Sequence, residues 1–141
     1  MADPRLDTKF DDIGAEYVTF KIDDSTITYS ATEVNGSAQV GLAVTFSDDE
    51  TVQLVGDGEA VVGKLIKVEK DGYCVVQTAG FMTLPAGTSA SLTNGKKIVG
   101  DLLVSAEGYI REVNTATAAE LGVQRGMIVD NSVTTAVVVR L

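Results

Sequence analysis

Short runs of Val, Ile, Leu and Thr alternate with Gly, Asp and Asn from Val52 to the C-terminus. Turn-forming clusters that recur about every ten residues between such runs are typical of an all-β sandwich or barrel, because each run forms one short strand and each cluster reverses the chain. Little sequence is left over for helices. We therefore predict an all-β fold: a compact sandwich or barrel-like single domain with several β-hairpins and at most one short helix.

The strongest hairpin signal is Asp71-Gly72, which separates the apolar runs Val61–Lys70 and Tyr73–Ala79. Asp-Gly favours a tight two-residue turn because it tolerates the positive φ angles that such a turn requires. The same region contains Gly58–Lys64, which has the glycine and lysine spacing of a phosphate-binding loop. That loop needs a Ser or Thr where this chain has Leu65, so we interpret the segment as part of a strand.

Thr117–Gly122 is the one segment with helix signals. Thr117 followed by Glu120 fits a capping box, and Gly122 fits a C-terminal stop. A short connecting helix is expected there. Upstream, Thr26–Tyr29 is one of the runs that we predict to be strands.

Residues 1–14 differ from the rest of the chain because they show neither strand alternation nor a turn defined by glycine. We predict an extended N-terminal arm over residues 1–14 and one β domain over residues 15–141. A terminal arm is often frayed, but a partner can also order it. Three large apolar side chains, Leu6, Phe10 and Ile13, lie among the four aspartates of this arm.

Composition disfavours catalysis and nucleic-acid binding. The 141 residues include no histidine, the commonest general base near neutral pH and the commonest zinc ligand. Cys74 is the single cysteine and lies in an apolar run, where a thiol usually packs as a small hydrophobe. The formal net charge of −9 repels phosphate backbones. We expect no enzymatic activity, no cofactor, no metal and no nucleic-acid partner. The acidic clusters Asp23-Asp24 and Asp48-Asp49-Glu50 are interpreted as solvated turns.

The N-terminus lacks the basic start and apolar stretch of a signal peptide, and no window approaches the length of a membrane span. We therefore expect no membrane partner.

From about Gly56 to the C-terminus, the order of motifs resembles a family of capsid decoration (cement) proteins of tailed double-stranded DNA phages. Each motif alone is weak, and the combination carries the resemblance. The matching segments are Val62–Glu69 with its Asp71-Gly72 turn, Cys74–Gly80, Leu84–Gly87, Gly95–Asp101, Arg125–Val129 and Val137–Leu141.

This resemblance implies a head-stabilising protein that binds the outer surface of a mature phage capsid and bridges neighbouring subunits of the major capsid protein. It also implies a homo-oligomer, with a homotrimer favoured over the monomers and dimers that decorate other capsids. Such a protein is made in the bacterial host cytoplasm and ends on the virion. The predicted capsid contacts are Leu6, Phe10 and Ile13.

Two other functions remain open at this point. A phage tail or baseplate component, or a host-adhesion module, can be built on a similar acidic β domain. A hydrolase that uses carboxylates from distant strands is less favoured, because the chain has no histidine and no Trp and only four Tyr.

Overall fold

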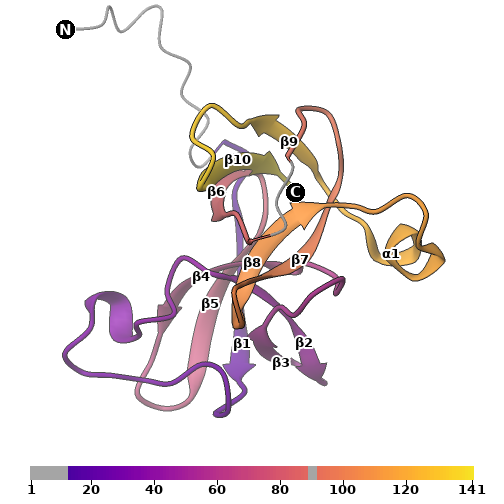
Figure 1. Cartoon of the computed structure of the whole chain (residues 1–141). Helices are drawn as coiled ribbons and strands as arrows, with labels where there is room; N and C mark the ends of the chain where they lie inside the picture. Colours follow the sequence, from indigo (N-terminus) through magenta and orange to yellow (C-terminus); the bar gives the residue numbers. More distant parts are fainter. Residues whose placement is uncertain (1–12, 89–91) are drawn as a thin grey trace, which may run out of the picture.

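β-Strands are the main regular secondary structure in the computed structural model, which describes residues 13–88 and 92–141 (Figure 1). The all-β prediction is confirmed. The elements in chain order are β1 (Glu16–Ile22), the 3-10 turn η1 (Val34–Gly36), β2 (Ala43–Asp48), β3 (Thr51–Leu54), β4 (Gly63–Val68), β5 (Tyr73–Ala79), β6 (Phe81–Pro85), β7 (Ile98–Leu103), β8 (Ala106–Glu112), α1 (Ala118–Val123), β9 (Met127–Asp130) and β10 (Ala136–Arg140).

The first five strands close into a barrel in the order β1-β3-β2-β4-β5. The antiparallel pair β5–β1 closes the ring, and the β1–β3 pair is parallel and short, with Lys21 opposite Thr51 and Ile22 opposite Val52. Alternate side chains of each strand point inward, as the two-residue period of a strand requires. Together with Ile27, which lies outside the strands, they fill the barrel with a cluster of buried residues: Ile27, Val44, Val52, Leu54, Leu65, Val68, Cys74 and Val76.

The remaining strands form a second layer, in which β6, β9 and β10 lie above the barrel in the view of Figure 1. A three-stranded sheet in the order β6-β10-β9 and the β7–β8 hairpin enclose a second hydrophobic cluster. β2 contributes to both clusters, because Ala43 belongs to the second cluster and its neighbour Val44 belongs to the barrel cluster. The strand alternation of β2 therefore joins the two cores into one domain.

The predicted β4–β5 hairpin is confirmed, and its turn is one residue longer than expected. The amide of Glu69 donates to the carbonyl of Tyr73 at 2.8 Å, and the amide of Gly72 donates to the carbonyl of Glu69 at 3.2 Å. Gly72 has a φ of +90°, whereas Asp71 keeps a negative φ. The connection is therefore a three-residue loop with glycine in the left-handed position, the form that accompanies a G1 bulge.

The predicted strand at Thr26–Tyr29 is wrong. The backbone there takes part in turns, with the Ile27 amide donating to Asp23 and the Thr28 amide to the side chain of Gln39. Ile27 is nevertheless fully buried in the barrel cluster. The alternating pattern in this segment therefore reflects one anchoring side chain and not a strand.

The short helix is confirmed, but the predicted capping box is wrong. Thr117 is the N-cap residue and makes no side-chain capping hydrogen bond. Glu120, which the box would direct back to Thr117, faces Arg111 on β8 instead. Gly122 lies inside α1, which ends at Val123.

Candidate interaction surface

The most buried ion pair in the described part of the chain holds α1 against the β7–β8 hairpin. The guanidinium of Arg111 donates to both carboxylate oxygens of Glu120, at 2.7 and 2.9 Å, and to Asp57 at 3.0 Å. The amide of Asn114 also donates to Glu120. These contacts hold the pKa of Glu120 below its ordinary value, chiefly through the Arg111 hydrogen bonds. Both oxygens of this carboxylate are engaged by the protein, so it is poorly placed to accept a substrate proton.

A second arginine, Arg125, connects the two layers through backbone carbonyls. Its guanidinium donates to Val62 at 2.6 Å, to Val61 at 3.3 Å and to Thr78 on β5. Arg125 itself lies between α1 and β9. Burial lowers the pKa of this guanidinium. The hydrogen bonds of this side chain therefore link the second layer to the barrel.

The thiol of Cys74 is fully buried in the barrel cluster, as the sequence predicted. Burial raises the pKa of this thiol to about 11. Because the thiolate is the nucleophilic form of cysteine, Cys74 is unreactive near neutral pH.

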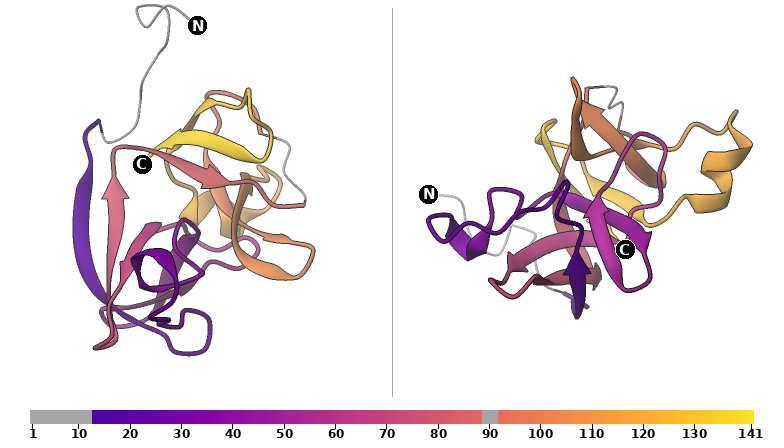
Figure 2. Two further views of the ribbon diagram at one scale, coloured as in Figure 1. Left: turned by 90° about the vertical axis from the view of Figure 1, so that its left-hand side faces the viewer. Right: turned by 90° about the horizontal axis from the view of Figure 1, so that it is seen from below.

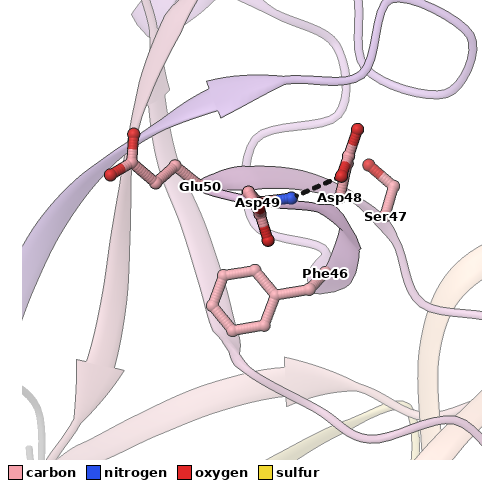
Figure 3. Close-up of a pocket in the computed structure, with 5 residues that line it drawn as sticks. All are labelled: Phe46, Ser47, Asp48, Asp49 and Glu50. Atoms are coloured by element: carbon pink, nitrogen blue, oxygen red, sulfur yellow. Dashed lines mark hydrogen bonds between the residues drawn. The ribbon is translucent and has the colours of Figure 1, made fainter.

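The largest surface depression that we describe lies at the tip of the β2–β3 hairpin and measures about 490 Å³ (Figure 3). Phe46, Ser47, Asp48, Asp49 and Glu50 line it. Figure 3 shows that the three carboxylates fan out in different directions, and all three residues are exposed. In residues 13–88 and 92–141, no group of three or more His, Cys, Asp or Glu side chains is arranged to hold a metal ion. Because Asp48, Asp49 and Glu50 are exposed at the turn between β2 and β3, the predicted solvated turn at these residues is confirmed.

β1 lies on the outer flank of the barrel (Figure 2), and some of its apolar side chains are exposed. Tyr17 and Val18 are 50% and 40% exposed, although they lie in a barrel strand. Among the described residues β1 pairs with β5 over most of its length but with β3 only at its last two residues, so one edge of its first half has no paired strand. Phe46, 51% exposed, packs edge-on against Phe20 at 5.3 Å between ring centroids.

Ile13 adjoins this strand and is 54% exposed. Its carbonyl accepts a hydrogen bond from the amide of Phe81 at 3.0 Å, which ties Ile13 to the start of β6. We call the exposed side chains of Ile13, Tyr17, Val18 and Phe46 the β1 surface. Ile13, Tyr17 and Val18 lie in β1 or just before it, and Phe46 on β2 is joined to them through its contact with Phe20 of β1.

Of the three predicted contact residues, the structure places Ile13 on the β1 surface. Leu6 and Phe10 lie outside the described residues. Sequence reasoning missed Tyr17, Val18 and Phe46, because in a predicted strand half of the apolar residues are expected to face the core. One face of β1 carries Val18, Phe20 and Ile22, and the other carries Tyr17 beside Thr19 and Lys21. The alternation alone therefore predicts that Val18 is buried, and it gives no signal for its exposure.

No helix among the described residues is both long and apolar enough to cross a membrane. The chain matches no family model, no curated protein and no solved structure.

Proposed function

We propose that this protein is a capsid decoration protein that binds the outer surface of a mature tailed-phage head and stabilises the shell by bridging neighbouring major capsid protein subunits. The observation that carries the proposal is the β1 surface, where exposed apolar side chains line the first half of a strand and lead directly into the N-terminal segment. Exposed apolar patches of this kind mark surfaces that bind other proteins.

Two further features support a binding role. Four buried or half-buried titratable groups, Arg111, Glu120, Arg125 and Cys74, are committed to the fold through hydrogen bonds or through burial in the core. The motif order from about Gly56 onward resembles the decoration family, in which the proteins act without catalysis.

The mechanism is a clamp that acts by mass action. A protein that binds only the mature lattice stabilises that lattice, because the shell must release the bound copies before it can come apart. When one oligomer touches several capsid subunits, each further contact forms at a high effective concentration. A site made from several subunits has the correct spacing only after the lattice has expanded, so the clamp discriminates against the compact procapsid.

The test is to mix the purified protein with undecorated mature shells and with procapsids, to image both, and to measure shell melting. We expect regular outer density on mature shells, a higher melting temperature, and little density on procapsids. Density confined to the tail would replace this proposal with the tail-component hypothesis. Absence of any density on the particle would reject both.

Variants of the β1 surface make the test specific to residues. Val18→Ser combined with Phe46→Ser removes two exposed apolar side chains, and we expect at least about fivefold weaker attachment, as for truncation of interface anchors. Leu121→Ser is the matched control, because Leu121 is 42% exposed on α1, away from β1. Equal attachment of the two variants would contradict a role for the β1 surface.

A further inference from the structure

The tip of the β7–β8 hairpin keeps an apolar side chain in water at a conformational cost. Val104 is 86% exposed and has a φ of +61°. Leu103 and Ala106, the residues that flank the turn, are paired across the hairpin. Val104 and Ser105 therefore form a two-residue turn. A positive φ at only the first of the two central residues is the pattern of a type II′ turn. That first position favours glycine. A β-branched residue there is a genuine outlier.

The tip is also held rigidly. The amide of Val104 donates to the hydroxyl of Thr88, and the amide of Thr88 donates to the carbonyl of Leu102 at 2.8 Å. Leu103 is 42% exposed beside it, and no residue from Leu102 to Ala106 carries a charge. A fixed, uncharged, apolar projection loses little conformational entropy when a partner binds it.

A cavity of matching size opens elsewhere on the same chain. It measures about 80 Å³ and is lined by Leu92, Asn131, Thr134 and Val137. An apolar cavity of roughly 150 Å³ binds benzene, so about half that volume suits the three carbons of an isopropyl group, the side chain of valine. The amide of Asn131 donates to the carbonyl of Leu92, so this polar group already has a partner inside the cavity wall.

We propose that the Val104 tip of one copy inserts into the Leu92–Val137 cavity of a second copy of this chain. With a net charge of −9, two copies repel each other over most of their surfaces. This contact joins an uncharged tip to a cavity without charged lining residues, so it brings two copies together where that repulsion is least. The tip and the cavity are different surfaces, so the contact is heterologous, and successive copies can close into a ring.

Sedimentation equilibrium of the purified chain tests this contact with two variants and a control. Val104→Gly removes the side chain and the strain together, so we expect an unchanged or higher melting temperature with self-association weaker by at least about tenfold. Thr134→Phe obstructs the cavity from an exposed position and is expected to weaken association to a similar extent. Val34→Ala is the control, because Val34 is 81% exposed in η1 and belongs to neither partner surface.

A mixing experiment tests the pairing itself. The Val104→Gly chain keeps its cavity and the Thr134→Phe chain keeps its tip, so a mixture is expected to form a one-to-one complex that neither variant forms alone. A wild-type chain that sediments as a monomer, a Val104→Gly chain that associates as Val34→Ala does, or a mixture without complex would each overturn the proposal. No shells are used, so these outcomes are independent of the proposed capsid function.

Discussion

At the residue scale, the turn between β4 and β5 depends on a single glycine. Gly72 has a φ of +90°, and a Cβ atom added there would meet no atom within 4 Å. Substitution at this position is therefore opposed by backbone conformation alone, without a steric clash.

We expect Gly72→Val to destabilise the fold by about 1–3 kcal/mol, because a β-branched residue is strained at positive φ. Chemical denaturation followed by circular dichroism measures the change. Gly122→Ala is the control, since Gly122 lies in α1 with equally open surroundings but without positive φ. It should leave stability unchanged or raise it by up to about 1 kcal/mol. Equal midpoints for Gly72→Val and the wild type would mean that the turn is assigned wrongly.

At the element scale, α1 is held by one ion pair more than by its own sequence. It has six residues and no side-chain cap, and its only buried residue is Glu120. A helix of this length is not stable alone. The position of α1 therefore depends on the Arg111–Glu120 contact.

We expect Arg111→Met to cost about 3–5 kcal/mol, because it leaves the Glu120 carboxylate buried without its partner. The double variant Arg111→Met/Glu120→Leu should recover most of that loss, since it removes the stranded charge as well. The denaturation midpoints of the two variants and the wild type measure this loss and its recovery. A double variant as unstable as the single one would show that the packing of Arg111, and not its charge, holds α1.

The same pair predicts a pH dependence of stability. Hydrogen bonds from Arg111 lower the pKa of Glu120 in the folded state below its unfolded value. Its contribution is therefore complete above the unfolded pKa and is lost as the pH falls through the folded pKa. Wild-type protein should lose more stability than the Arg111→Met/Glu120→Leu variant between neutral and acidic pH. Parallel stability curves for the two proteins would contradict this coupling.

Strand positions were predictable where polar turn residues mark both ends of a run. The strand at Tyr73–Ala79 was predicted with the bounds that the structure shows. The β7–β8 turn was not predicted, because Val104-Ser105 contains no Gly, Asn or Asp to signal a chain reversal. The side-chain partner of Glu120 could not be predicted from the sequence either. Glu120 has the spacing of a capping residue, and only the tertiary structure brings Arg111 to it.

At the scale of the whole molecule, the division into a barrel and a second layer could not be read from the sequence. Apolar alternation identifies strands but does not say which of two cores each side chain enters, as Ala43 and Val44 show. The candidate surface was predicted only in part for the same reason. Ile13 was identified because it lies outside any predicted strand, whereas Tyr17 and Val18 were hidden within one.

Removal of the N-terminal segment separates folding from attachment. We expect deletion of Met1–Ile13 to cost about 1 kcal/mol of folding stability, since it removes the Ile13–Phe81 backbone hydrogen bond. Attachment to mature shells should fall by about tenfold or more. Deletion of Met1–Asp12, which keeps that bond, is the control for stability. A shortened chain that decorates shells as fully as the wild type would remove the segment from the proposed contact.

Gly80, at the corner between β5 and β6, brings the two extremities of the described chain together. It exchanges two backbone hydrogen bonds with Leu141, at 3.0 and 3.2 Å, and it abuts Ile13 and Gly14 on its other side. A short peptide could thus join residue 141 to residue 13 and make the polypeptide circular, with little entropy lost on closure. New ends cut between the exposed Asp48 and Asp49 should then give a circular permutant with the same β-rich circular dichroism spectrum. A permutant that fails to fold would show that the order in which the strands are synthesised matters to this architecture.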